Sequence, residues 1–400
     1  MRHPASGRRD GASPWSTQLV SGIEGMAEFE PFHREHQWHP ESHCDLLIAA
    51  ANEGQAVPLL LGVFRDGRLV TLVVAHLVDT AVPWRVGYGR IGASRARAIE
   101  VLRGGLLGDT SLECLEVAFD RLRAAMKELR VDAIAARHVV ADSPAHAVFT
   151  KRPGWFCRDR LAVATANGQM TVPSSFAEFT KAQSKRERED NRRYEKRIRA
   201  QFGDGVRVEH LASAGDIDRF ATAVESIARK TYQRGLGAGF HDSPQERARW
   251  AVAADGGWLH ASVLWLGDEP AAFCTGFAVG ETLWLEHIGY DPAHRRLRPG
   301  IHLLHRVIEQ IAIDGRFRAI DFGIGDADYK RRLCSAWQTD VTVWVFAPTW
   351  RGLWLNGMRT STNALYRLGH TMLDRLGLLD RFKRRWRRAL EAPENEPAAS

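Results

Sequence analysis

"LWLEHIGYDPAHRRLRPGIHLLHRVIEQI" (residues 283–311) is the stretch of this 400-residue chain that decides its fold. A strand ends near Tyr290, and a short loop then leads to Pro299 and Gly300, where proline's fixed φ suits the first turn of a helix. The apolar residues of that helix recur on one face, at Ile301, Leu304, Ile308 and Ile311. The stretch therefore predicts a strand, a loop and an amphipathic helix that packs on a sheet.

The loop between this strand and helix places cations beside a helix start. Arg295, Arg296 and Arg298 lie in it, and the first turn of a helix has N–H groups without an intrahelical partner. Free N–H groups, the positive end of the helix dipole and guanidinium groups together attract phosphate. The loop, with Gly300, therefore predicts a phosphate or pyrophosphate site, and a solvated basic loop is the alternative.

The two halves of the chain repeat one plan. Residues 59–91 and 258–290 each read as three strands joined by turns, and each is followed by a helical stretch, 111–128 or 300–313, and another apolar segment. The turn formers of "TANGQMTVPSS" (165–175) separate the halves. We therefore expect an α/β protein with two similar domains in tandem. The expected parts are a flexible N-terminal segment (1–44), a first domain (45–170), a second domain (171–349) and a basic helical tail (350–400).

Charge is concentrated in two places. Between residues 181 and 200, nine Lys or Arg accompany four acids, and six of the eight residues of "RFKRRWRR" (381–388) are basic. A basic helix with apolar neighbours contacts an anionic membrane surface or nucleic acid, or it packs one face on a domain with its cations in water. The formal net charge of +7 agrees with an anionic partner in either case.

Composition argues against other classes of protein. The longest apolar runs, such as "LVTLVVAHLV" (69–78), are far shorter than the roughly 20 residues of a membrane-spanning helix. No apolar stretch follows the N-terminal arginines, so we expect a cytoplasmic protein. The five cysteines are scattered, and we expect them to be reduced. Four histidines lie close together, but Pro40 interrupts them and no metal site is predicted; they are His33, His36, His39 and His43.

A second motif, "DFGIGDADYKRRL" (321–333), follows the next apolar segment. Gly323 and Gly325 loosen the backbone where this strand ends, which lets polar side chains converge on a cleft. The polar residues that follow offer a carboxylate, a phenol and an ammonium in Asp326, Tyr329 and Lys330. A helix N-terminus with a surface run of cations is the alternative.

These two stretches carry a resemblance. The spacing of Arg295 and Gly300 resembles the acyl-CoA pyrophosphate loop of GNAT acyltransferases, with Arg298 where that pattern has glycine. "YDPAHRRLRPG" followed by "DFGIGDADYKRR" resembles the CelD-type acetyltransferases of cellulose and exopolysaccharide biosynthesis, over about 176–346. The resemblance extends more distantly to Fem-type transferases, which take aminoacyl groups from tRNA. It implies tandem GNAT-like domains with mixed central sheets, and acyl-CoA, in the first place acetyl-CoA, as co-substrate without a metal.

Acyl transfer from a thioester assigns a role to each candidate residue. The acceptor must lose a proton, and Glu286 or His287 is the candidate base, depending on which face of the strand meets the cleft. Asp326 orients or accepts a proton, Tyr329 protonates the leaving thiolate, and Lys330 holds phosphate or polarises the carbonyl.

The sequence thus predicts an acyltransferase that acts on an amine or hydroxyl of a sugar, lipid-linked or peptide-like acceptor. This places it in exopolysaccharide or cell-envelope biosynthesis, with contact to the inner membrane face through the basic tail. A Fem-like transferase that uses aminoacyl-tRNA and a non-catalytic nucleic-acid-binding protein are the alternatives.

Overall fold

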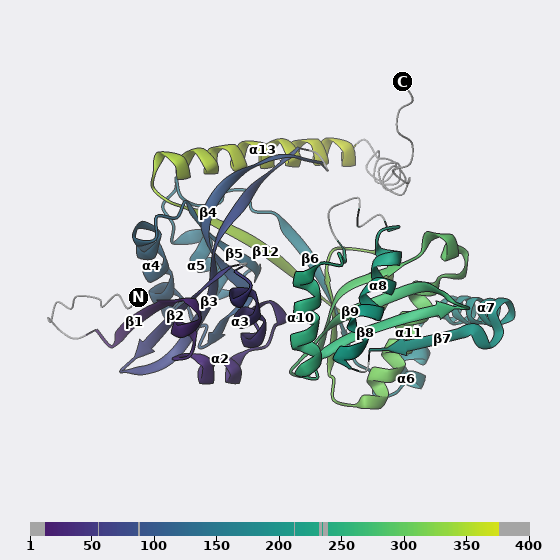
Figure 1. Cartoon of the computed structure of the whole chain (residues 1–400). Coiled ribbons are helices and arrows are strands. Elements are labelled where there is room, and N and C mark those ends of the chain that lie inside the picture. Colours follow the sequence, from purple (N-terminus) through teal and green to yellow (C-terminus); the bar gives the residue numbers. More distant parts are fainter. Residues whose placement is uncertain are drawn as a thin grey trace, which may run out of the picture. The chain divides into compact units, whose positions relative to one another are not determined.

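The computed structural model of the chain describes residues 13–375, apart from 55, 87–88, 212, 232–233 and 235–238 (Figure 1). The protein is α/β, as the sequence predicted, and its contacts divide it into two compact units. One unit comprises the described residues up to Ala166 together with those from Gln338 onward, and the other is Asn167–Trp337. Among the described residues, no helix is both long and apolar enough to cross a membrane.

The first unit has a six-stranded mixed sheet. Its strands, in sheet order, are β1 (Trp15–Ser21), β2 (Val57–Arg65), β3 (Arg68–Val86), β4 (Gly89–Gly108), β5 (Ala133–Val140) and β12 (Ala336–Phe346). Its helices are α1 (Gly22–Met26), α2 (Glu30–His36), α3 (Cys44–Asn52), α4 (Leu112–Glu128) and α5 (Pro144–Lys151), with a 3-10 turn η1 (Pro40–Ser42). Strands β4 and β5 pair in parallel, whereas β1 with β2, β2 with β3, β3 with β4 and β5 with β12 pair antiparallel. The α4 and α5 side chains complete a core against one face of the sheet.

The segment expected to be flexible is folded where the structure describes it. Trp15–Ser21 forms the edge strand β1, which pairs antiparallel with β2 from Trp15 opposite Arg65 to Ser21 opposite Leu59. Helices α1 to α3 then cover a second face of this sheet through Phe29 and Leu47. The prediction of a flexible segment over 1–44 is therefore corrected for residues 15–44. The polar composition of this segment suggested flexibility. Its strand, however, pairs with residues more than thirty positions further along the chain.

The second unit also has a six-stranded mixed sheet. Its strands, in sheet order, are β6 (Ala164–Thr171), β11 (Ala319–Ile324), β10 (Thr282–Tyr290), β9 (Glu269–Val279), β8 (Leu259–Leu266) and β7 (Val206–His210). Its helices are α6 (Phe176–Ala182), α7 (Lys185–Phe202), α8 (Ile217–Ala228), α10 (Pro244–Asp255), α11 (Pro299–Asp314) and α12 (Asp328–Leu333), with 3-10 turns η2 (Gly203–Gly205), η3 (Ala214–Asp216) and η4 (Pro292–Leu297). Residues of α6, α7 and α11 form one core with the sheet, and α8 and α10 form another. Alternation along β8 makes this possible, because Leu264 packs with the first group and Val263 with the second.

The closing strand of each sheet does not follow the expected domain order. Strand β12 comes after the whole second unit in sequence, yet it pairs antiparallel with β5 of the first unit. Strand β6 ends the first half of the sequence and pairs antiparallel with β11. The expected contiguous domains 45–170 and 171–349 therefore differ from the observed units. A strand pattern predicts that a strand forms, but not which of two similar edges it joins.

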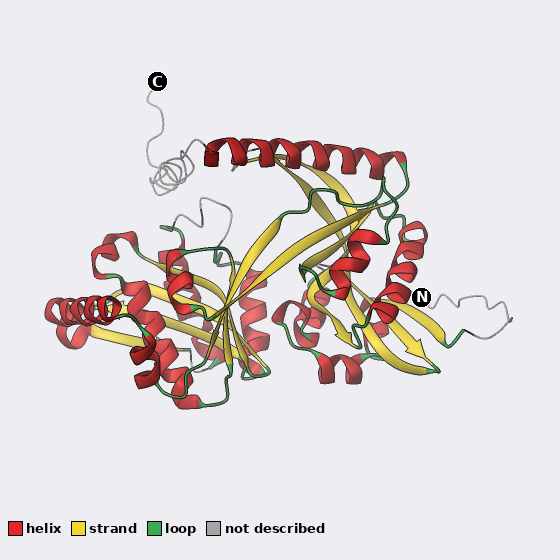
Figure 2. Cartoon of the chain, turned by 180° about the vertical axis from the view of Figure 1, so that it is seen from behind, coloured by secondary structure: helices red, strands yellow, loops and turns green. Residues whose placement is uncertain are grey.

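Helix α13 (Trp350–Arg375) packs on the first unit along its described length (Figure 2). The side chain of Asn356 donates to the carbonyl oxygens of Phe156 at 2.7 Å and Arg158 at 3.0 Å. Arg359 pairs with the buried Asp159 at 3.0 Å. Residues 350–375 of the expected tail are therefore a docked helix, and the basic run 381–388 lies outside the described residues.

Candidate active site

A cleft opens in the second unit where two parallel strands separate. Strands β10 and β11 pair from Thr282–Trp284 to Ala319–Asp321, and along these two described strands the pairing extends no further. Beyond it, Gly323 at φ 68° and Gly325 at φ 104° adopt conformations that favour glycine. A cavity of about 470 Å³ lies next to this divergence. Its walls come from the end of β10, from η4, from the start of α11 and from α12.

The predicted phosphate loop forms one wall of this cleft. Asp291 receives a hydrogen bond from the N–H of Ala293 at 2.9 Å and one from the ammonium of Lys230 at 2.6 Å, which fixes the start of η4. Arg298 follows in the left-handed region, at φ 51°, and no described side chain caps the helix α11 that it precedes. The N–H groups of Ile301 and His302 reach the Arg298 carbonyl. No described side chain therefore competes with a ligand for the backbone at the start of α11.

The predicted anion-binding residues are brought together with one exception. Arg295, Arg298 and Gly300 all line the cleft, whereas Arg296 is exposed and does not line it. The Arg298 guanidinium lies over the Tyr194 ring, 4.6 Å from its centroid, and this contact holds a side chain whose backbone is in an unusual conformation. Arg332 lines the opposite wall and was not among the predicted anion-binding residues. Its only sequence signal was membership in the run "KRR".

The second predicted motif forms the other wall, and its residues have different roles. Tyr329 lines the cleft, with its ring packed edge-on against Phe322 at a centroid distance of 6.2 Å. Asp326 is half exposed and forms an ion pair with Arg331. Lys330 is buried, and its ammonium donates to the carbonyl oxygens of Gly323 at 2.9 Å and Ile324 at 2.8 Å.

Lys330 therefore fixes the glycine turn, and it is not one of the residues that line the cleft. A buried carboxylate holds the same turn from the other side. Asp321 accepts hydrogen bonds from the Gly323 N–H at 2.7 Å, from Asn167 at 2.7 Å and from Gln169 at 2.9 Å. The sequence analysis did not assign Asp321 a role, although it begins the quoted motif.

The two candidate bases on β10 lie beside each other in a separate polar cluster. Glu286 falls in a break of the β9–β10 register, between Leu285 and His287, so it stands out of the regular ladder. Arg249 donates to Glu286 at 3.0 Å and to Glu246 at 2.8 Å. Burial by itself lowers the pKa of Arg249, but the carboxylates of Glu286 and Glu246 raise it above its ordinary value, so the guanidinium stays charged.

The ligand atoms of Glu246, Glu286 and His287 lie within 4.8 Å of one another, which is close enough to hold a metal ion. The Arg249 guanidinium, however, already sits between the two carboxylates and supplies the positive charge that a cation would bring. Glu286 and His287 do not line the cleft themselves, but Ile288, Gly289 and Tyr290 follow them on β10 and do.

The first unit differs at the equivalent helix start. Helix α4 follows β4 as α11 follows β10, but the carboxylate of Asp109 accepts the N–H of Ser111 at 2.8 Å, directly before α4. This backbone hydrogen bond holds the pKa of Asp109 below its usual range, so the group is an anion at neutral pH. The Asp109 carboxylate beside the start of α4 opposes a second anion there.

In the same sheet, Arg103 and Asp340 form a buried ion pair at 3.1 Å.

Comparison with known proteins agrees with this geometry. Residues 185–331 match the family model described as an acetyltransferase (GNAT) domain. The second unit is therefore similar to a GNAT acetyltransferase domain. The match covers α7 through α12 and therefore includes both walls of the cleft. No curated protein matches the sequence significantly.

Several solved structures are similar to the chain at low sequence identity. The crystal structure of FemX shares 12% identity and a TM-score of 0.56, with 82% of this chain and 97% of that chain covered. A tandem GNAT protein from the clavulanic acid biosynthesis pathway has 12% identity, a TM-score of 0.48, and coverage of 84% and 99%. The C-terminal domain of a putative lysylphosphatidylglycerol synthetase from Agrobacterium fabrum has 9% identity, a TM-score of 0.49, and coverage of 88% and 96%. The likeness to FemX shows a common fold.

Proposed function

We propose that the protein transfers an acyl group, in the first place acetyl, from acyl-CoA to an amine or hydroxyl of a sugar, lipid-linked or peptide-like acceptor. The observation that carries the proposal is the cleft with an uncapped helix start, Arg295 and Arg298 on one wall and Tyr329 on the other. The motif resemblance to CelD-type acetyltransferases supports an acceptor in exopolysaccharide or cell-envelope biosynthesis.

The donor fits the cleft by its chemistry. Its pyrophosphate accepts hydrogen bonds from the start of α11 and from the two guanidinium groups, which oppose its charge. Its pantetheine arm then extends into the space where β10 and β11 separate. Peptide-like amides in that arm meet strand backbone that the sheet pairing leaves available there.

In the proposed reaction the acceptor attacks the thioester carbonyl, the new C–N or C–O bond forms and the C–S bond breaks. Glu286 or His287 takes the acceptor proton, directly or through a water, from its position two or one residues before the cleft-lining Ile288. Tyr329 gives its phenolic proton to the departing thiolate, and proton exchange with solvent restores it. The proposed base thus lies on β10, and the proposed acid lies on α12, which follows β11.

The direct test compares Tyr329→Phe with wild type, using acetyl-CoA and a panel of amino sugars, amino acids and hydroxylated glycans. We expect turnover to fall by about 100-fold or more, the range for loss of a general acid, while acetyl-CoA affinity stays within about threefold. Tyr366→Phe, on α13, is the matched control. Unchanged turnover in Tyr329→Phe would show that the phenol takes no part in the reaction. If the protein bound no acyl-CoA saturably, the proposed donor would be overturned.

Aminoacyl-tRNA is the alternative donor, because the fold is shared with FemX and α7 exposes many cations. The exposed cations of α7 include Lys185, Arg186, Arg192, Lys196 and Arg197. Binding of acetyl-CoA and of charged tRNA to the full chain, measured side by side, separates the two donors. Binding of tRNA alone would favour the Fem-like function.

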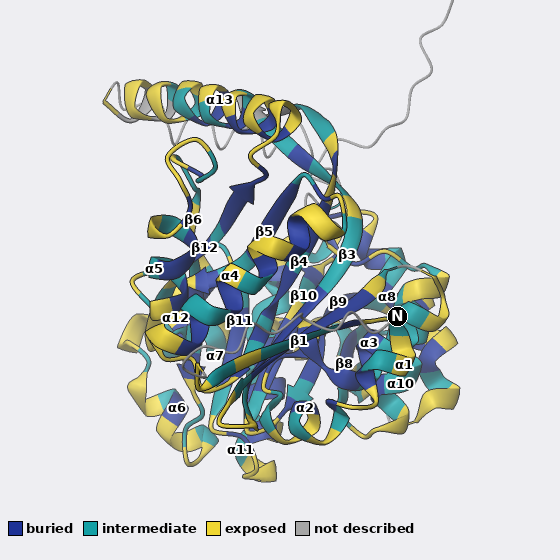
Figure 3. Ribbon diagram, turned by 90° about the vertical axis from the view of Figure 1, so that its left-hand side faces the viewer, coloured by how far each residue is buried: buried dark blue, intermediate teal, exposed yellow. Residues whose placement is uncertain are grey.

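The outer face of α13 supports an acceptor at a lipid surface. Five apolar side chains share one face of this helix, and their exposed fractions range from 47% to 79%: Trp350, Trp354, Leu365, Leu368 and Met372. The buried Leu355 and Arg359 lie on another face. Figure 3 shows exposed residues along α13. The chain continues from this helix into "RFKRRWRR". An apolar helix face followed by clustered cations fits an anionic lipid surface, where apolar side chains enter the interface and cations meet headgroups.

Vesicle sedimentation tests this contact. The protein should bind vesicles that contain phosphatidylglycerol more strongly than vesicles of phosphatidylcholine alone, and Leu365→Ser with Leu368→Ser should reduce that binding at least fivefold. Ile313→Ser removes an equally exposed apolar residue from α11 and is the control. Equal binding by the double variant would contradict a lipid-facing α13, and a wild-type dimer that the double variant abolishes would assign this face to a second copy.

A further inference from the structure

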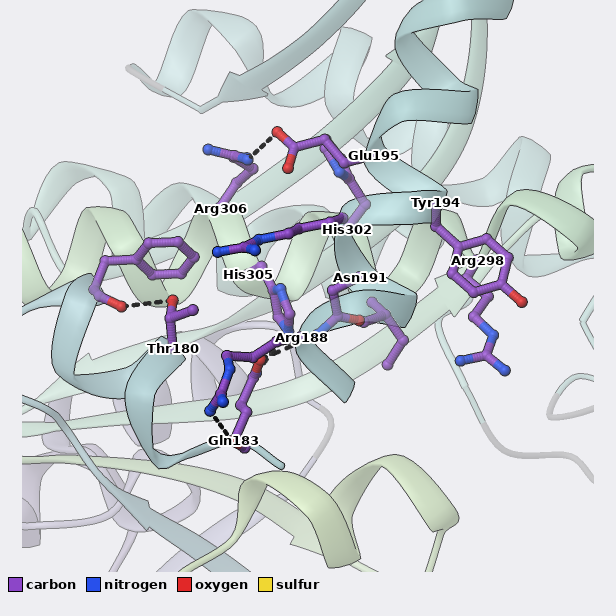
Figure 4. Close-up of a pocket in the computed structure, with 13 residues that line it drawn as sticks. Thr180, Gln183, Arg188, Asn191, Tyr194, Glu195, Arg298, His302, His305 and Arg306 are labelled. Carbon is purple, nitrogen blue, oxygen red and sulfur yellow. Dashed lines mark hydrogen bonds and ion pairs between the residues drawn. The ribbon is translucent and has the colours of Figure 1, made fainter. Parts of the chain in front are cut away.

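A smaller pocket lies beside the donor cleft, between α6, α7 and α11. Its volume is about 200 Å³, and it shares Arg298 and Ile301 with the donor cleft, so the two cavities meet at the start of α11. Figure 4 shows its interior, with Arg306 and Glu195 joined on one side and Arg298 beside Tyr194 on the other. The acyl-transfer chemistry proposed above uses none of its residues other than Arg298.

The pocket is strongly cationic. Its charged lining residues are four arginines and one glutamate, and the glutamate, Glu195, pairs with Arg306 at 2.7 Å. Arg188 donates to the carbonyl oxygens of Gln183 at 2.6 Å and Lys181 at 3.2 Å, which hold the side chain without neutralising it. Arg188, Arg192 and Arg298 therefore leave an excess positive charge at this site.

Two histidines supply neutral polar groups in the same pocket. Burial lowers the pKa of His302 and of His305 to about 4, so both imidazoles are uncharged at neutral pH. His305 lies 3.3 Å from the side-chain nitrogen of Gln183, and Asn191 donates to the Gln183 oxygen at 3.2 Å. The pocket thus combines fixed guanidinium groups with amide and imidazole groups that match the hydroxyls and phosphate of a sugar phosphate.

We propose that this pocket binds the 3′-phosphorylated ribose of acyl-CoA. The proposal rests on the proposed donor. The pyrophosphate of CoA joins the pantetheine arm on one side and the phosphorylated nucleoside on the other. With the pyrophosphate at the start of α11 and the pantetheine arm in the larger cleft, the nucleoside extends away from that cleft. Arg298 borders both cavities, so a nucleoside that passes it enters the smaller one. A phosphomonoester carries close to two negative charges at neutral pH, which the excess guanidinium charge opposes.

Arg192 is the residue that best isolates this contact, because it is exposed on α7 and lines only the smaller of the two cavities. The experiment measures, by calorimetry on the full chain, the affinity for CoA and for dephospho-CoA, which lacks the 3′-phosphate. Wild type should bind CoA at least tenfold more tightly than dephospho-CoA, the scale of a charge-assisted hydrogen bond. Arg192→Gln should weaken CoA about tenfold and leave dephospho-CoA within twofold.

Arg186→Gln removes an exposed arginine from the same helix outside the pocket and should bind both ligands as wild type does. Equal wild-type affinities for CoA and dephospho-CoA would overturn the inference and leave the proposed donor intact. Equal weakening of both ligands in Arg192→Gln would also overturn it, since the side chain would then act elsewhere than on the 3′-phosphate. If the wild-type protein bound neither CoA nor dephospho-CoA, the proposed function and the inference would both be overturned.

Discussion

Replacing Lys330 by methionine tests whether this residue acts on the substrate or on the backbone. Its side chain is 5% exposed, and its ammonium holds the carbonyl oxygens of Gly323 and Ile324. Methionine fills a similar volume but donates no hydrogen bond, so both carbonyls lose this donor. Hydrogen bonds from a charged group contribute about 1.5–3 kcal/mol each, and they are partly offset by the cost of burying the charge. We expect the variant to lose about 2–4 kcal/mol of unfolding free energy.

For a unit of this size such a loss lowers the melting temperature by roughly 5–15 °C, which thermal and urea unfolding followed by tryptophan fluorescence will detect. Affinity for acetyl-CoA should fall as well, because the released turn borders the cleft. Arg331→Met is the control, since its exposed pair with Asp326 is worth less than about 1 kcal/mol. Wild-type stability and CoA affinity together with a turnover loss of about 100-fold would refute this reasoning and restore a catalytic role for Lys330.

Three further predictions follow from the same structure. Arg295→Ala should weaken acyl-CoA binding by about 1–3 kcal/mol in calorimetry, whereas Arg296→Ala, outside the cleft, should leave it within about twofold. The chain should bind one CoA, because the Asp109 carboxylate beside the start of α4 opposes an anion there, and a measured stoichiometry of two would contradict this. The unfolding free energy should fall as pH drops from 6.5 toward 4, since in that window unfolded His302 and His305 bind protons that the folded protein excludes. His305→Gln should flatten this slope in urea unfolding at several pH values, and an unchanged slope would show that His305 titrates normally.

Local signals in the sequence were enough for the fold class and for the loop and helix start at Pro299 and Gly300. Pro299 and Gly300 mark a helix start wherever they occur after a strand, and the arginines beside them needed no distant partner to be noticed. Lys330 illustrates the limit, because a cation in a polar motif looks the same whether it faces a ligand or a carbonyl. Asp321 illustrates it further, since one of its partners, Asn167, is 154 residues away and comes from a strand of another part of the chain.

The sequence also could not predict which sheet β6 and β12 would join, because that choice depends on residues distant in the chain. Each of β6 and β12 follows a strand and a short helix, β5 and α5 in one case and β11 and α12 in the other. Neither pairs with that preceding strand, because β6 pairs antiparallel with β11 and β12 with β5. Two edges with the same geometry offer nearly the same hydrogen-bonding pattern, so periodicity alone does not choose between them. The choice depends on side chains that meet only in the folded protein, such as Thr165, which donates to the backbone of Asp340 at 3.2 Å.

The starts of α4 and α11 differ in the charge that the chain places beside them. Each helix follows one strand of a parallel pair, α4 after β4 and α11 after β10, and both helix starts carry the same partial positive charge. In the first unit Asp109 supplies a carboxylate from within the chain, and the charge of the helix start is opposed permanently. In the second unit Arg298 adds a positive charge at the corresponding point and turns the backbone left-handed. An opposing anion would then come from outside the chain, and the proposed preference for a phosphorylated donor depends on the residue that precedes the helix more than on the helix itself.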